Sequence, residues 1–423
     1  MTELRNKILQ SVSNDNFFEV VYQLYLYEKS DREKVASILI QLHNDNLIDA
    51  ITEFRKVFKS ATNNDTYLIN RLFEESLAEL DATVEAVMEC IHHLSSQSDE
   101  SISSMDCAFT NYCLKDLSRT DTAVKLALDK GGDWLNFVCP ALVAGSKSNL
   151  QQYTSMALDF IRSENHELRT AIVFSFSMFD YSQNQPILGV VTSELKRISS
   201  VLDDNTLAAN ILRIALNFKA TTQENKVEIY QLVKLILLKE SDDISNAAAY
   251  GFWIVQKELS ENILDLLIDK LKNTRTGNYR AFDNIDRGLC QLIKSDKYDI
   301  AIEFIEYILL KHPKDFEMKV FDSFIRDIYK HPKLSFLITR WFLSRKLPLC
   351  KACLGIIGQS YGKDVELKAD NILISNSYAD ARMLVARKAV GWFFTSPISS
   401  TSYLISLIEH ADDVEIVDIE ELL

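Results

Sequence analysis

Two cysteines, Cys350 and Cys353, have the spacing found in metal-binding and redox motifs. A structural zinc site needs four ligands, and neither a second cysteine pair nor a histidine pair lies near them in the sequence. A thioredoxin-like motif would need a strand before it, and the preceding residues do not have strand character. The spacing therefore favours two buried cysteines one turn apart on a helix.

The stretch Glu89-Cys-Ile-His92 has the Glu-x-x-His spacing that supplies ligands in di-iron helical bundles. Those proteins need the motif twice, with two more glutamates on other helices, and this chain contains one copy. His92 and His93 are neighbours and cannot share one helix face. We interpret Glu85 and Glu89 as a solvated helix face and assign no metal ligand.

Two further stretches resemble catalytic motifs but lack their defining residues. Before Gly362-Lys363, a phosphate-binding loop would need glycine where Ile357 stands, and Asp364 replaces the required Ser or Thr. Residues 367–374 resemble the end of a protein-kinase catalytic loop, but Glu366 occupies the place of the catalytic aspartate. We assign no catalytic or cofactor-binding residue and expect no cofactor. A non-enzymatic role is favoured, and an active site assembled from distant segments stays open.

Charge is unevenly distributed along the chain, whose formal net charge is −14. Residues 60–110 contain ten acidic residues and one basic residue, whereas residues 307–351 contain ten basic and four acidic residues. An acidic chain disfavours general coating of nucleic acid, because phosphate binding requires positive surface. The contrast between the two segments indicates charged surfaces that bind partners.

The basic segment is predicted to present a row of cations. A helix expected over 316–329 buries one apolar stripe, and Lys319, Arg326 and Lys330 are spaced to line another face. The candidate partner-binding residues are Lys319, Arg326, Lys330, Lys333, Arg340, Arg345 and Lys346. Stacked helical units would gather them into a ridge that binds an acidic protein or phosphates. Ordinary solvated side chains are the competing interpretation.

A repeated helical pattern organises residues 163–273. Polar or acidic openings at Glu164, Asp203 and Asp242 follow one another at intervals of about 39 residues, and each precedes an apolar helix. Asp203 and Asp242 are predicted N-caps. The second helices of the three units are expected over 187–202, 227–238 and 263–271. This period, with two helices per unit, resembles the HEAT/armadillo class of α-solenoid repeats.

The resemblance implies an all-α fold, an α-solenoid of HEAT-like helical hairpins that forms a superhelix, because one hairpin cannot bury its apolar face alone. An irregular helical bundle is the alternative. Only 11 glycines and 6 prolines in 423 residues agree with helices rather than tightly turned sheets. The predicted parts are an N-terminal helical block at 1–95 with an acidic hairpin near 60–95, a polar linker or loop at 96–104, the repeat solenoid at 105–411, and an acidic tail at 412–423.

Proteins of the HEAT/armadillo class usually act as protein-binding scaffolds. The resemblance therefore implies a non-enzymatic scaffold or adaptor subunit that holds protein partners, or copies of itself, through the acidic N-terminal part and the basic 307–351 segment. The alternative is a nucleic-acid-backbone-binding HEAT-like protein, similar to a DNA glycosylase or to a regulatory subunit of a nucleic-acid-processing complex. Seven scattered cysteines and a polar N-terminus favour the cytoplasm, and no apolar stretch predicts a membrane span.

Overall fold

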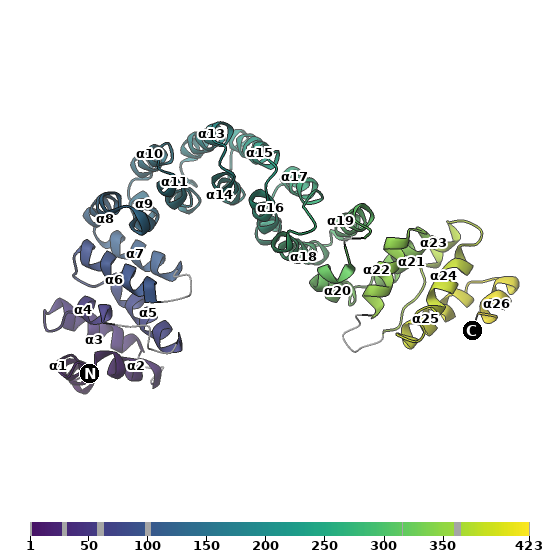
Figure 1. Ribbon diagram of the computed structural model, residues 1–423, viewed down its shortest axis with the longest axis horizontal. Coiled ribbons are helices and arrows are strands. Elements are labelled where there is room, and N and C mark those ends of the chain that lie inside the picture. Colours follow the sequence, from purple (N-terminus) through teal and green to yellow (C-terminus); the bar gives the residue numbers. More distant parts are fainter. Residues whose placement is uncertain are drawn as a thin grey trace. The chain divides into compact units, whose positions relative to one another are not determined.

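The computed structural model describes residues 2–27, 32–56, 63–97, 103–314, 316–358 and 365–422. These residues form α-helices and short 3-10 helices with no β-strand among them, which confirms the all-α prediction (Figure 1). None of the described helices is long and apolar enough to cross a membrane. The chain divides into two compact units, Met1–Leu232 and Val233–Leu423, which we call unit 1 and unit 2.

Unit 1 is built from helices that pack on their neighbours in the sequence. Its α-helices are α1 (Thr2–Ser13), α2 (Phe17–Tyr27), α3 (Arg32–Asn44), α4 (Ala50–Arg55), α5 (Asn63–Leu77), α6 (Val84–Gln97), α7 (Ser103–Lys115), α8 (Leu117–Lys130), α9 (Val138–Ser146), α10 (Leu150–Ile161), α11 (His166–Ile172), α12 (Ser175–Met178), α13 (Gln185–Val201) and α14 (Asn205–Ala215). A 3-10 helix, η1 (Gly132–Phe137), joins α8 to α9, and α15 (Gln223–Leu237) contains the boundary between the units. The helix α9 packs against α7, α8 and α10, and α10 packs in turn against α11 and α13.

Short polar side chains begin the repeat helices, one residue away from the predicted caps. The Asp204 carboxylate accepts a 2.9 Å hydrogen bond from a first-turn backbone N–H of α14. The Ser241 hydroxyl does the same at 3.2 Å for α16 (Asp242–Ile254). An N-cap residue keeps an extended backbone, and Asp204 and Ser241 have that conformation. The prediction of Asp203 and Asp242 as caps is therefore wrong by one position in each case.

Unit 2 continues with helical hairpins and ends in a less regular part. Its further α-helices are α17 (Glu261–Leu271), α18 (Tyr279–Lys294), α19 (Tyr298–Lys311), α20 (Asp322–Ile328), α21 (Leu334–Leu343), α22 (Leu347–Gly358), α23 (Asn371–Ser375), α24 (Ala381–Val390), α25 (Pro397–Ile408) and α26 (Asp413–Glu420). Two 3-10 helices, η2 (Gln256–Glu258) and η3 (Met318–Phe321), follow α16 and precede α20.

The helices α16, α18 and α20 pack side by side in unit 2 (Figure 1). Gly288 on α18 allows a close approach to α16, because a Cβ atom at this position would lie 2.2 Å from the Phe252 ring. Asp286 on α18 joins α20, since its carboxylate accepts backbone hydrogen bonds from Ser323 at 2.9 Å and from Phe324 at 2.8 Å. The absence of a side chain at Gly288 thus allows the contact between α16 and α18, and the buried Asp286 carboxylate links α18 to α20.

The helix predicted over 316–329 consists of two elements. Residues Met318–Phe321 form η3, and α20 begins at Asp322. The carboxylate of Asp286 binds the first N–H groups of α20 from the neighbouring helix and so allows a new helix to begin there. Lys319 therefore lies outside the helix that carries Arg326, and the predicted row of three cations on one helix is wrong.

An extended segment, residues 365–370, is held by hydroxyl groups of two helices. The backbone N–H groups of Leu367 and Ala369 donate to Ser402 and Ser406 of α25, at 2.9 and 2.8 Å. The N–H of Asp370 donates to Thr339 of α21 at 3.1 Å. Because these hydroxyls satisfy backbone groups that a helix would satisfy internally, the segment stays ordered without being helical.

The predicted acidic tail at 412–423 contains the helix α26. Asp412 caps this helix, and the Oε2 atom of Glu415 lies 2.8 Å from Nε of Arg382 on α24. Ile419 is buried, so the segment packs on the rest of unit 2.

Part of the predicted linker at 96–104, residues 98–102, lies outside the described part of the chain. The same holds for residues 359–364 of the glycine-containing stretch considered as a phosphate loop.

Candidate functional site

Unit 1 contains an open cavity of about 1080 Å³, which we call the unit 1 cavity. Its lining comes from the C-terminal half of α6, the first turns of α7, the 3-10 helix η1, the start of α9, and helices α11 and α12. Segments from residue 91 to residue 178 therefore contribute to one site. Sequence analysis did not identify this cavity.

His92, which lines the unit 1 cavity, stacks on an aromatic ring that is not part of the lining. The rings of His92 on α6 and Trp134 on η1 stack, with centroids 5.2 Å apart and planes 7° from parallel. Two glycines position Trp134, since Gly131 (φ 65°) and Gly132 (φ 55°) adopt left-handed backbone angles at the end of α8. Glycine takes that conformation without steric cost, so the chain can leave α8 abruptly and enter η1. The Gly-Gly pair is the one local sequence signal that could have indicated the break between α8 and η1 beside this cavity.

Three acidic side chains line the cavity: Asp106 on α7, Asp133 on η1 and Glu167 on α11. Neither lysine nor arginine occurs among the described residues that line it. His92 is the basic group beside one of these acids, with its Nε2 atom 4.0 Å from Oδ2 of Asp133, and it carries charge only when protonated. The lining therefore gives the cavity a negative potential.

Asp106 has the most perturbed carboxyl group of the cavity. Its side chain is accessible from the mouth, yet protein atoms crowd the carboxyl group, and this burial raises the pKa of Asp106 to about 6. No hydrogen-bond donor or cation within the described chain binds its carboxylate and opposes the shift. Burial, with a contribution from the charge of Asp106, also raises the pKa of the Cys139 thiol to about 12. Cys139 is therefore a protonated thiol and not a reactive thiolate.

The rim of the cavity exposes apolar side chains where α11 and α12 are interrupted. Phe174 lies in the break between the two helices and is 37% exposed, and Met178 at the end of α12 is 52% exposed. The Oγ1 atom of Thr170 is buried and has no hydrogen-bond partner among the described residues. The rim thus offers apolar surface, with a buried, unsatisfied hydroxyl group close by.

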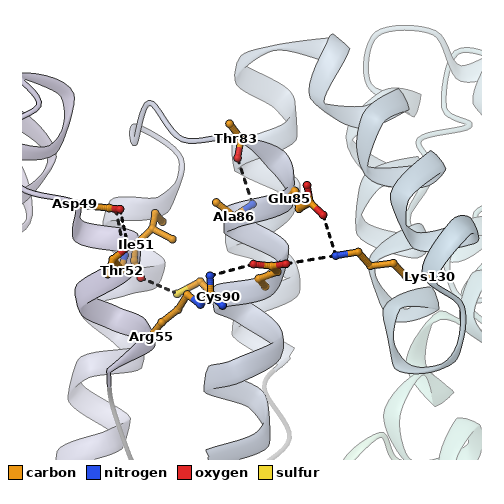
Figure 2. Close-up of polar contacts among 10 residues, drawn as sticks. Asp49, Ile51, Thr52, Arg55, Thr83, Glu85, Ala86, Cys90 and Lys130 are labelled. Atoms are coloured by element: carbon orange, nitrogen blue, oxygen red, sulfur yellow. Dashed lines mark hydrogen bonds and ion pairs between the residues drawn. The ribbon is translucent and has the colours of Figure 1, made fainter.

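Ion pairs hold α6, which carries His92, against the helices on both sides (Figure 2). The Oε2 atom of Glu89 lies 3.0 Å from Nη1 of Arg55 on α4, and its Oε1 atom lies 3.5 Å from Nζ of Lys130 on α8. Oε1 of Glu85 lies 3.1 Å from the same Nζ atom. Glu85 is exposed and Glu89 is half-buried, so this helix face is solvated as predicted, and both residues also form cross-helix ion pairs that the sequence did not indicate.

Cys350 and Cys353 are buried on α22, as the sequence predicts. Their Sγ atoms lie 3.6 Å from the carbonyl oxygen of Trp341 and 3.8 Å from that of Ile338, respectively. Burial raises the pKa of both thiols. In the part of the chain that the structure describes, no group of three His, Cys, Asp or Glu side chains is arranged to hold a metal ion.

Four of the seven basic candidate residues in unit 2 contact other side chains of the chain. The contacts are Lys319 with Glu317 (Nζ to Oε2, 2.6 Å), Lys333 with the Tyr298 ring (Nζ to centroid, 5.0 Å), Arg340 with Glu306 (Nη2 to Oε2, 2.8 Å) and Arg345 with Asp380 (Nη2 to Oδ1, 2.7 Å). The side chains of Arg326, Lys330 and Lys346 are exposed and have no ion-pair partner within the described residues. A role in partner binding stays a prediction for all seven.

The fold and the cavity define an all-α protein of consecutive helical hairpins with an open cavity that three acidic side chains line, an architecture compatible with a helical-repeat solenoid. No protein-family model matches the chain, and a search of curated proteins finds no relative. The HEAT/armadillo resemblance therefore rests on the sequence pattern and on the helical fold.

Proposed function

We propose that the protein is a cytoplasmic interaction scaffold, a solenoid of HEAT-like hairpins that binds a partner protein at the unit 1 cavity. The observation that carries the proposal is an open cavity of about 1080 Å³ whose rim exposes Phe174 and Met178. Small-molecule sites usually measure roughly 300–1000 Å³ and enclose most of their ligand. Open sites with exposed apolar side chains are more typical of surfaces that bind another protein.

The cavity gives the acidic segment at 60–110 a specific role in this proposal. His92 and Asp106 belong to that segment and line the cavity. The exposed cations Arg326, Lys330 and Lys346 supply a second charged surface for an acidic partner or another copy of the chain.

Binding of a nucleic-acid backbone has less support from the described residues. The acids that line the cavity repel phosphate, and four of the seven basic candidates already contact side chains of the chain. DNA or RNA binding that weakens steeply with salt, and that the double variant Arg326→Glu/Lys330→Glu abolishes, would favour this alternative.

Site-specific photocrosslinking in the native host tests the proposed scaffold function. A benzophenone amino acid replaces Met178 at the cavity rim, and the control replaces Val201, which is 69% exposed at the end of α13. We expect a specific protein adduct from position 178 and not from position 201. The identified partner, once purified, should bind wild type and Val201→Asp but bind Met178→Asp weakly. Equal adducts at both positions, or normal binding to Met178→Asp, would refute the proposed site.

A further inference from the structure

We propose that the unit 1 cavity binds a basic amphipathic segment of a partner protein, with a lysine or arginine side chain directed at Asp106 and an adjacent apolar side chain packed on Phe174 and Met178. This inference rests on the proposed scaffold function and adds the chemistry of the ligand. Charge, desolvation and exposed apolar surface each support one part of it.

Charge complementarity identifies the ligand as cationic. Asp106, Asp133 and Glu167 bring three carboxyl groups to one cavity, and its described lining contains neither lysine nor arginine. Lys130 lies near Trp134, the ring that stacks on His92, with its Nζ atom 4.0 Å from the Trp134 centroid, but two glutamates of α6 already pair with it. A lysine or arginine from another protein would therefore meet carboxyl groups without displacing an internal cation.

Among the three acids of the cavity, Asp106 is the one whose charged form a cationic ligand would stabilise most. Asp106 is exposed at the cavity, protein atoms surround part of its carboxyl group, and no donor within the described chain binds it. This partial desolvation raises the pKa of Asp106 to about 6. An ammonium or guanidinium group would stabilise the charged form at Asp106 more than at a fully solvated acid.

The exposed apolar side chains select an amphipathic ligand over a purely polar one. Phe174 and Met178 stay in contact with water in the free protein. Methionine is flexible and polarisable, and it adapts to apolar groups of different shape. A segment with neighbouring basic and apolar side chains would neutralise the acids and cover this surface at the same time. A free polyamine would satisfy only the acids, so we assign a protein segment.

Fluorescence anisotropy with the full chain and a labelled amphipathic lysine/leucine peptide tests the assignment. We expect this peptide to bind, a glutamate/leucine peptide of the same length not to bind, and spermidine not to displace the bound peptide. The double variant Asp106→Asn/Glu167→Gln should weaken binding about tenfold, because two carboxylates of the cavity are lost.

A matched control is needed because a chain with net charge −14 attracts any cationic peptide. The double variant Glu33→Gln/Glu224→Gln removes the same charge from the first turns of α3 and α15, outside the cavity lining. It should bind the peptide like wild type. Equal weakening by the two double variants would overturn the inference, and so would displacement of the peptide by spermidine.

The variant Met178→Ser separates the apolar contact from general attraction, because it removes the thioether without changing the charge of the cavity. We expect it to bind the peptide more weakly than Val201→Ser, whose position on α13 lies outside the cavity lining. Equal binding by the two variants would overturn the inference. If crosslinking at position 178 captures a partner that binds Asp106→Asn/Glu167→Gln like wild type, the inference fails and the scaffold function stands. The absence of any specific adduct at position 178 refutes the scaffold function itself.

Discussion

The carboxylate of Asp286 on α18 accepts a 2.8 Å hydrogen bond from the backbone N–H of Phe324, in the first turn of α20. A second bond, from the N–H of Ser323, measures 2.9 Å. Asp286 is buried, and the first N–H groups of a helix have no acceptor within that helix. One helix therefore caps the next, and the formation of α20 depends on its packing against α18.

We expect Asp286→Ala to lower the free energy of unfolding by about 2–4 kcal/mol, because two N–H groups at a buried helix start lose their acceptor. Asp286→Asn retains one oxygen as an acceptor and should lower the free energy of unfolding by less than Asp286→Ala. Urea denaturation measures the loss, and hydrogen exchange at Ser323 and Phe324 locates it. Asp283→Ala is the control, since within the described residues this exposed aspartate on α18 pairs with Arg287 of its own helix, at 3.2 Å. A similar loss for Asp283→Ala would contradict the capping role.

Gly288→Ala should separate α16 from α18. The added Cβ atom would lie 2.2 Å from the buried Phe252 ring, and overpacking of this kind costs ~1–3 kcal/mol. In a double-mutant cycle, Phe252→Leu should recover part of that loss, because the smaller side chain relieves the overlap. Gly277→Ala is the control, since nothing lies within 4 Å of a Cβ atom there. Additive effects of Gly288→Ala and Phe252→Leu would show that the two residues do not constrain each other.

The helical fold could be predicted from sequence because its determinants are local. The helices expected over 187–202 and 263–271 match α13 and α17 to within two residues, whereas α15 begins at Gln223, four residues before the expected start at 227. The start of α20 could not be predicted, because its cap, Asp286, comes from 37 residues earlier in the chain. The partner of Arg340 is likewise Glu306, 34 residues away on α19.

The candidate site was predictable only in part. An acidic segment was evident, and Gly131-Gly132 marked an interruption of the helices. The cavity itself is lined by segments from residue 91 to residue 178, and it results from packing between helices that are distant in the sequence. Composition identified the basic residues of unit 2 but not which of them contact other side chains.

Glu89→Gln should weaken the attachment of α6 to both neighbouring helices. Glu89 pairs with Arg55 and with Lys130. A half-buried acid with two cationic partners should contribute about 1 kcal/mol to the free energy of unfolding, which is the upper end for surface ion pairs. This loss of stability should be smaller at high salt, because salt screens the charges. Thermal unfolding at low and high salt measures it, with Glu75→Gln as the control, since Glu75 pairs with Arg71 on its own helix. A loss that does not change with salt would show that charge is not its cause.

Thr339→Val should destabilise the C-terminal part of unit 2 by ~2 kcal/mol, because valine keeps the shape and removes the hydroxyl group. That hydroxyl lies 2.7 Å from the buried Tyr403 hydroxyl and accepts the N–H of Asp370. Hydrogen exchange of residues 365–370 should rise in the variant. Thr122→Val is the control, since its exposed hydroxyl bonds to a carbonyl of its own helix. Unchanged exchange in the 365–370 segment would contradict the proposed restraint.

The raised pKa of Asp106 predicts a pH-dependent stability difference between wild type and Asp106→Asn. Because the folded state holds the proton more tightly than the unfolded state, the contribution of Asp106 is complete below about pH 4 and is lost as the pH rises through about 6. Asp106→Asn should therefore melt at the same temperature as wild type near about pH 4 and at a higher temperature near about pH 7. Asp116→Asn should not show this rise, because hydrogen bonds from Ser118 lower the pKa of Asp116. A melting difference for Asp106→Asn that is constant across this range would contradict the raised pKa of Asp106.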